Sequence, residues 1–177
     1  MVLLYAGSNG LMQFTLRSWQ AEDLASAVRF GSTPSVCAFM SDAFPDTSEK
    51  WVRFLENTIG NNEILYRAIE INGMAAGGIG VSLRNDEGGT CGELGYWLGE
   101  QFRNRGVMTR AVVTMLRMAF AAFPVDRIVA LPFSHNQASH RVLEKAGFVL
   151  EKRLEKSIVR NGVELDQLLY AVNRRHQ

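Results

Sequence analysis

The fold is decided by the stretch Glu93-Leu94-Gly95-Tyr96-Trp97-Leu98-Gly99-Glu100-Gln101-Phe102-Arg103-Asn104-Arg105-Gly106-Val107-Met108-Thr109, which predicts a strand, a short turn and the start of a helix. Beyond the turn, apolar residues recur at helical spacings of three and four and give the helix one apolar stripe. These residues are Met108, Ala111, Val112, Met115, Leu116, Ala119 and Phe120.

The turn before this helix carries Arg103, Arg105 and Gly106. A helix N-terminus leaves about four backbone N–H groups unpaired, and the helix dipole adds partial positive charge there. Glycine lets a ligand approach the backbone closely, and guanidinium groups pair well with phosphate. These features favour a phosphate-binding site. An ordinary strand-to-helix turn, with arginines that only add solubility, explains them about equally well.

Two motifs together resemble those of the GNAT N-acetyltransferases. Arg103-x-x-Gly106-x-Met108, after Leu94-Gly95-Tyr96-Trp97-Leu98, is similar to the acetyl-CoA signature of that family. About thirty residues later, Asn136-Gln137-Ala138-Ser139 and Val142–Phe148 resemble its second conserved helix. The Asn-x-x-Ser form and the Gly-Tyr-Trp strand resemble the RimJ/RimL-like branch, which acetylates ribosomal-protein N-termini. The resemblance extends over residues 13–172.

The resemblance implies acetyl-CoA as co-substrate, and no metal. Its pantetheine arm is expected to bond along the strand backbone much as an added strand would. The residues expected to bind it are Tyr96, Trp97, Leu98, Arg103, Asn104, Arg105, Gly106, Val107, Met108, Thr109, Asn136 and Ser139. Asn136 and Ser139 have an alternative role as helix-start residues that satisfy backbone donors.

The implied reaction moves an acetyl group from a thioester to a primary amine, which must first lose a proton. Glu93 is the candidate base, directly or through a water. The alternative is a structural carboxylate paired with a neighbouring arginine. Many family members place a tyrosine acid at the position of Leu143, so Ser139 is the candidate acid here, unless the thiolate leaves unassisted. A strand N–H is expected to bind the oxyanion.

The hydrophobic pattern along the chain predicts an α/β fold of the α+β type. Period-two segments predict strands over residues 13–17, 64–71, 74–83, 127–131, 149–159 and 164–172, and helical stripes fall within 21–28 and 51–59. Asn72-Gly73 and Asn161-Gly162 predict type I′ hairpins. The strand–helix–strand order predicts a parallel pair with a right-handed crossover. The resemblance adds that this pair is central and splayed in a mixed, mostly antiparallel sheet with flanking helices.

The same pattern predicts one domain over residues 13–172. Residues 1–12 are expected to form a flexible overhang, with Met12 as an alternative start, and residues 173–177 a solvated tail. Asp46-x-x-Glu49 and Ser134-x-x-Gln137 are expected to cap helices. His140 is expected at the surface, as are Arg141 and Lys145, which could alternatively reach a CoA phosphate. The apolar residues Phe39, Met40 and Phe44 are expected to fill the core or, as a second option, to wall the acceptor site.

Composition narrows the classes of partner. The 177 residues include 19 basic and 18 acidic side chains, so no global charge draws the chain to nucleic acid or to a membrane. No apolar run approaches the ~20 residues of a membrane span. Cys37 and Cys91 match no metal-ligand spacing and are expected to be reduced thiols in a cytoplasmic protein.

The acceptor is expected to be a protein N-terminus or a small amine, and the terminal hairpin could pair two copies as a homodimer. A non-catalytic sensor that binds acyl-CoA is the alternative function.

Overall fold

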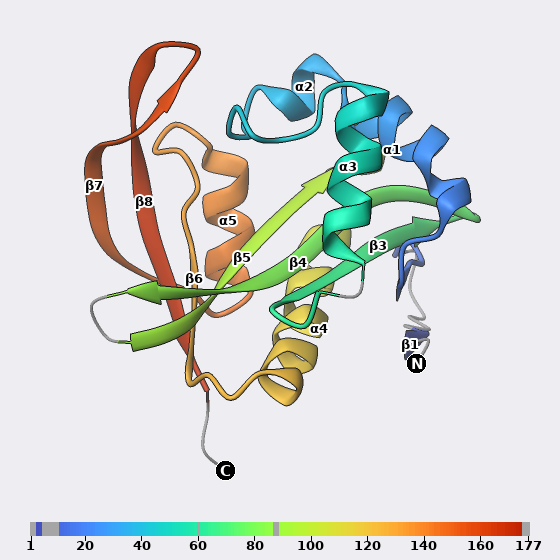
Figure 1. Cartoon of the computed structure of the whole chain (residues 1–177). Coiled ribbons are helices and arrows are strands. Elements are labelled where there is room, and N and C mark those ends of the chain that lie inside the picture. The colour runs from blue at the N-terminus through green and yellow to red at the C-terminus, as the bar shows by residue number, and fades with distance from the viewer. Residues whose placement is uncertain (1–2, 5–10, 60, 87–88, 175–177) are drawn as a thin grey trace.

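The computed structural model describes residues 3–4, 11–59, 61–86 and 89–174 (Figure 1). The strands form one mixed sheet in the order β1-β2-β3-β4-β5-β6-β8-β7. Neighbouring strands are antiparallel except for β5 and β6, which are parallel. The strands are β1 Leu3–Leu4, β2 Thr15–Arg17, β3 Ile64–Ile71, β4 Met74–Asp86, β5 Gly89–Leu98, β6 Arg127–Ala130, β7 Val149–Arg160 and β8 Val163–Asn173.

Helices cover both faces of this sheet. Figure 1 shows α3 in front of the sheet and α4 behind it. The helix α1 packs against α3 and β4, and α4 packs against α5 and against the other side of the sheet. The helices are α1 Leu24–Gly31, α2 Pro34–Cys37, α3 Ser48–Thr58, α4 Val107–Ala122 and α5 Gln137–Lys145, with short 3-10 turns η1 Ala21–Asp23 and η2 Glu100–Phe102.

The parallel pair at the centre of the sheet is splayed, as predicted. Its paired residues are Gly92 with Ile128 and Glu93 with Val129. Strand β5 continues beyond them to Leu98, where it is still paired with Gly77 of β4. The two strands therefore part after Glu93 and leave the far half of β5 with one neighbouring strand.

Both predicted hairpins are confirmed, because their turns have the backbone that type I′ requires. Asn72 and Gly73 have φ values of 50° and 76°, and Asn161 and Gly162 have 48° and 76°. Gly147, which follows the C-cap residue Ala146 of α5, has a φ of 94°. Its left-handed backbone closes the helix and directs the chain into β7.

An aromatic cluster fills the space between β5 and the front helices. The Trp97 ring lies 5.4 Å from that of Trp51 and 6.4 Å from that of Trp19, and its Nε1 donates to Tyr66 Oη at 2.9 Å. The glycine-rich part of β4 makes room for these rings, because a Cβ on Gly78 would lie 2.1 Å from Tyr66 Oη. Close packing of β4 against its neighbours therefore explains these glycines.

Several local predictions were wrong. The cap of α3 is Thr47 rather than Asp46, since Thr47 has extended backbone and its side chain accepts from the Lys50 N–H. The cap of α5 is Asn136 rather than Ser134. His140 is buried instead of exposed, because its ring stacks on Tyr170 and its Nε2 lies 3.1 Å from the Phe133 carbonyl oxygen.

The structure changes the predicted C-terminal end of the domain and describes only part of the predicted N-terminal overhang. Strand β8 includes Asn173, and Arg174 donates to the carbonyls of Phe123 and Val125, so a tail begins later than predicted. Residues 175–177 lie outside the described residues. The predicted overhang 1–12 also falls largely outside them, although Leu3–Leu4 pair with β2 and Met12 packs against the core.

Candidate active site

A cavity of about 820 Å³ lies where β5 and β6 part, and we call it the central cavity. Its lining joins the second half of β5, the turn into α4, the segment after β6, the start of α5, the loop after α2 and the β7–β8 hairpin. Of the predicted site residues, all but Arg105 line it: Glu93, Tyr96, Trp97, Leu98, Arg103, Asn104, Gly106, Val107, Met108, Thr109, Asn136 and Ser139. Arg105 is exposed and lines a smaller hollow next to Met12.

The turn into α4 presents backbone donors to the central cavity. Gly106 precedes the helix with a left-handed φ of 69°, and no side chain caps the first turn. A Cβ on Gly106 would meet no atom within 4 Å, so the approach to this backbone is open. The first-turn residues Val107, Met108 and Thr109 line the cavity. Free amide groups and the helix dipole together make this end of the cavity suited to an anion.

The Arg103 side chain braces this turn. Its Nε donates to the Leu98 carbonyl at 3.0 Å and its Nη2 to the Ser35 carbonyl at 3.2 Å. The guanidinium thus ties the turn to the end of β5 and to α2. Arg110 adds a second tie, because it donates to the carbonyls of Gly106 and Met12. The predicted role of Arg103 in phosphate binding stays a prediction, since its Nε and Nη2 donate to backbone carbonyls in the structure.

Glu93 lies at the cavity in an ion pair with Arg84, with 2.5 Å between Glu93 Oε2 and Arg84 Nη1. The pairing with a neighbouring arginine, one of the two alternatives for Glu93, is therefore present. Both side chains stay reachable from the cavity, with exposed fractions of 39% for Glu93 and 38% for Arg84. Because an exposed ion pair of this kind is weak, either side chain can leave it to bind another charged group.

On the other side of β5, Asn136, Ser139 and Tyr96 form a hydrogen-bonded group. Asn136 Oδ1 accepts from the Ser139 N–H at 3.1 Å, so Asn136 is a helix cap that also lines the cavity. Ser139 Oγ lies 2.7 Å from Tyr96 Oη. Burial raises the pKa of Tyr96 to about 12, although the bond with Ser139 acts to lower it. Leu143, where many family members have a tyrosine, is fully buried in the core.

The sequence analysis missed the Tyr96 hydroxyl, because it assigned only the Tyr96 backbone a role. The alternation along β5 was a usable signal. Trp97 contacts α3, so Tyr96 must face the opposite side of the sheet, where α4 and α5 pack. Glu93 shares the Trp97 side, so the candidate base and Ser139 stand on opposite faces of the parted sheet.

One wall of the cavity is formed by the loop after α2 and by the terminal hairpin. Phe39 and Met40 come from the loop, and Ile158 and Gln167 from β7 and β8. Phe44, in contrast, packs edge-on against Trp51 in the core. Phe44 therefore fills the core as expected, whereas the acceptor-wall role of Phe39 and Met40 stays a prediction that their place in the cavity lining supports. Arg141 and Lys145 also line the cavity, on the α5 side.

Two other findings concern only the part of the chain that the structure describes. There, no three His, Cys, Asp or Glu side chains gather closely enough to hold a metal ion. No helix within the same ranges has the length and apolar character that crossing a membrane requires.

The chain is similar in sequence and in fold to known acetyltransferases. The model of the acetyltransferase (GNAT) domain family matches residues 13–149. The SPbeta prophage-derived uncharacterized N-acetyltransferase YokL of Bacillus subtilis (strain 168) is 27% identical over 177 residues, covering 98% of this chain and 94% of YokL.

Two solved structures share the fold at lower identity. RimL, a ribosomal L7/L12 alpha-N-protein acetyltransferase, has a TM-score of 0.80 and 20% identity, covering 98% of this chain and 96% of RimL. The microcin C7 self immunity acetyltransferase MccE, solved with acetyl-CoA and AMP, has a TM-score of 0.78 and 24% identity, covering 94% of each chain.

Proposed function

Because the chain belongs to the GNAT acetyltransferase family, we propose that it moves an acetyl group from acetyl-CoA to the nitrogen of a primary amine. The observation that carries this proposal is the central cavity, which has free helix amides at one end and a carboxylate, Glu93, on the other face of the parted sheet. This arrangement suits a ligand with a phosphate-bearing end and a reactive end. A family relative, MccE, was solved with acetyl-CoA, which supports the choice of donor.

In the proposed reaction, the first-turn amides from Val107 to Thr109 hold the diphosphate, and the exposed edge of β5 beyond Glu93 bonds to the pantetheine arm. The thioester carbonyl then lies in the gap between β5 and β6. A free N–H of β5 at this gap binds the oxyanion. Arg103 keeps the turn and the strand end in register with each other.

The amine reaches the thioester from the Glu93 face. Glu93 takes its proton, directly or through a water, since an ammonium with a pKa of about 8 to 10 has no lone pair with which to attack. The nitrogen bonds to the carbonyl carbon and forms the tetrahedral oxyanion, and its second proton follows the first through Glu93 to water. The carbon–sulfur bond then breaks with its electron pair on the sulfur, which leaves on the Ser139 side. Because the amine attacks the thioester itself, no acyl-enzyme is needed.

The acceptor is a protein N-terminus or a small amine. The cavity wall formed by Phe39, Met40 and Ile158 is apolar, which favours an amine next to an apolar group over a polycation. Neither of the described cysteines, Cys37 and Cys91, is in a disulfide. Reduced cysteines and a donor made in the cytoplasm agree with a cytoplasmic enzyme.

The test is a screen of CoA-thiol release from acetyl-CoA against peptides with varied first residues and against small amines. Release that depends on an acceptor supports the enzyme, and the panel that responds identifies the acceptor class. The ion pair of Glu93 with Arg84 favours a second candidate, a sensor that binds acyl-CoA without turnover. Calorimetric binding of acetyl-CoA with no acceptor-dependent release would select that sensor, and absence of binding would contradict both.

A further inference from the structure

We propose that Tyr96 is a positioning residue whose hydroxyl donates to Ser139 Oγ and thereby aims the Ser139 proton at the departing sulfur. The inference rests on the proposed function and adds a residue to it. It treats Tyr96 and Ser139 as one unit, supplied by a strand and a helix that are far apart in the sequence.

The geometry fixes both members of this unit. Tyr96 extends from β5 across the cavity to the start of α5, where its Oη lies 2.7 Å from Ser139 Oγ and 3.4 Å from the Ser139 carbonyl oxygen. The Ser139 N–H is held by Asn136 Oδ1 at 3.1 Å. Both Tyr96 and Ser139 line the central cavity. The serine hydroxyl therefore sits on a fixed backbone beside the place where the strands part.

The 2.7 Å contact fits either hydroxyl as donor, and we assign the donor role to Tyr96, with the 3.4 Å contact to the Ser139 carbonyl as the weaker acceptor of the same proton. A serine hydroxyl has one proton to donate and two lone pairs with which to accept. A phenol is a stronger acid than an aliphatic alcohol and is the better hydrogen-bond donor of the two. With Tyr96 donating, the Ser139 oxygen is satisfied as an acceptor and its own proton is free to turn toward the cavity.

Tyr96 stabilises the leaving group by a chain of hydrogen bonds, without giving up its proton. Burial raises the pKa of the Tyr96 hydroxyl to about 12, whereas a thiol has a pKa near 8.5. Full proton transfer from Tyr96 to the thiolate is thus unfavourable by a factor of roughly 10³ in the equilibrium constant. The carbon–sulfur electron pair stays on sulfur, the sulfur leaves as thiolate that accepts from Ser139, and the amine proton goes to Glu93.

The experiment measures the leaving thiolate itself. CoA is bound to the wild-type protein, to Tyr96→Phe, to Ser139→Ala and to the double variant, and the thiol is titrated by its ultraviolet thiolate absorbance. We expect the pKa of the bound thiol to lie below that of free CoA in the wild type and to rise in both single variants. The double variant should match the single ones, because the two hydroxyls act in series.

Turnover supplies the second measurement. Each single variant should lower kcat about 10- to 100-fold, the range for losing a hydrogen bond to a charged group, with the KM for acetyl-CoA unchanged. Tyr170→Phe is the matched control, since it removes the hydroxyl that bonds Glu144 at 2.9 Å on the same helix. Tyr170→Phe should change neither the pKa of the bound thiol nor kcat. Phenylalanine keeps the ring of Tyr96, so the packing against the core is preserved.

The possible results separate the role of Tyr96 from the proposed acetyltransferase activity. A Tyr96→Phe variant that binds CoA with an unchanged thiol pKa overturns the inference, even if its kcat falls, because the tyrosine then acts only on structure. Such a result leaves the acetyltransferase proposal intact. A wild-type protein that binds no CoA overturns both.

Discussion

Gly106 combines two properties that can be separated by experiment. Its φ of 69° lies in the left-handed region that favours glycine, and no atom lies within 4 Å of an added Cβ at this residue of the cavity lining. We expect Gly106→Ala to destabilise the fold by about 1 kcal/mol and to weaken acetyl-CoA binding about tenfold, because the strained turn moves the first-turn amides. Denaturant unfolding and calorimetry measure the two effects.

Gly73 is the matched control for this prediction. It has a φ of 76°, it also has no neighbour within 4 Å of an added Cβ, and it lies in the β3–β4 hairpin. Gly73→Ala should lose similar stability and keep its affinity for acetyl-CoA. Equal affinity in the two variants would show that the turn before α4 does not hold the cofactor.

The Glu93–Arg84 pair offers a second test at this scale. If Glu93 is the base, Glu93→Gln should lower kcat about 10²- to 10⁴-fold with unchanged CoA affinity. Arg84→Gln removes the same ion pair but keeps the carboxylate, and an exposed pair contributes about 1 kcal/mol or less. Its kcat should stay within about fivefold of the wild type. Equal losses of kcat in both variants would mean that Glu93 serves only as the ion-pair partner of Arg84.

At the scale of the elements, sequence patterns within a few residues predicted helices, strands and turns well. Contacts between residues far apart in the sequence were not predicted. Periodicity placed α4 and the strands, and Asn-Gly pairs placed both hairpins, because these signals act over a few residues. Helix caps were misplaced by one or two residues, since several polar side chains near each helix start can serve as caps.

The site shows the same limit. The backbone donors of α4 could be predicted, because a glycine turn before an amphipathic helix is a local signal. The Tyr96–Ser139 contact joins residues 43 positions apart, and the burial of His140 depends on Tyr170 from β8. No pattern within either segment encodes those partners, which are brought together only by the order of strands in the sheet.

The junction of β2 with α1 supports a prediction about pH. Asp23 is buried and accepts from Arg17 Nη1 and Nη2 at 2.7 and 2.8 Å and from the Gln20 N–H at 2.9 Å. Burial raises the pKa of Asp23, but the bonds from Arg17 and Gln20 outweigh it and hold the pKa below its ordinary value of 3.8. The folded state therefore gains stability from this carboxylate above that value and loses it as the pH falls through the lowered pKa.

Replacing Asp23 tests this directly. Asp23→Asn should reduce the free energy of unfolding by about 3 kcal/mol at pH 7, the range for breaking a buried ion pair, and the difference from wild type should shrink below pH 4. Urea unfolding at several pH values measures it. Asp46→Asn, which removes an exposed pair with Lys50, should leave the free energy of unfolding nearly unchanged at every pH. If the loss of unfolding free energy in Asp23→Asn does not vary with pH, stability does not depend on the ionisation of Asp23, which contradicts the prediction.

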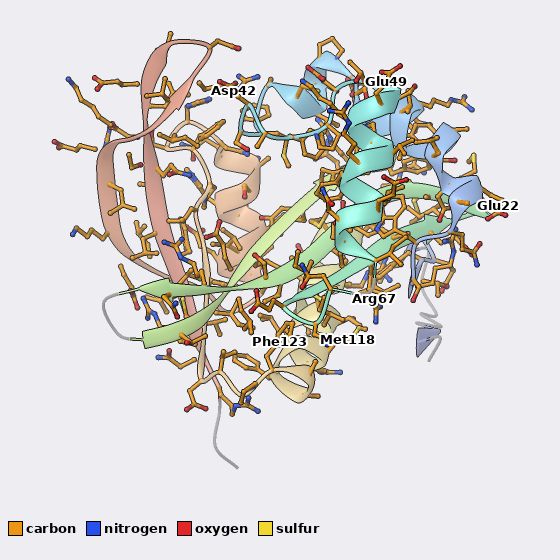
Figure 2. The ribbon with its side chains drawn as sticks, viewed as in Figure 1. Glu22, Asp42, Glu49, Arg67, Met118 and Phe123 are labelled. Atoms are coloured by element: carbon orange, nitrogen blue, oxygen red, sulfur yellow. The ribbon has the colours of Figure 1, made fainter. Side chains whose placement is uncertain are left out.

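At the scale of the whole molecule, one wall of the cavity is built by two segments that lie far apart in the sequence, the loop after α2 and the β7–β8 hairpin. Arg160, at the end of β7, donates to the carbonyls of Cys37 and Ala38 at 2.7 and 3.0 Å. The Asn161 N–H donates to Asp42, which Figure 2 shows on the loop between α2 and α3. The hairpin tip thus holds the loop that carries Phe39 and Met40 into the cavity wall.

This tie predicts a separation between the two substrates. Arg160→Ala should raise the KM for the acceptor about tenfold, because two hydrogen bonds that hold the wall are lost, and should leave the KM for acetyl-CoA unchanged. Glu164→Gln is the control on the same hairpin, since it removes only an exposed ion pair with Lys156. Steady-state kinetics with each substrate varied in turn measures the effect. A rise in both KM values would mean that the hairpin supports the parted sheet as a whole, and a rise in neither would mean that the acceptor does not touch this wall.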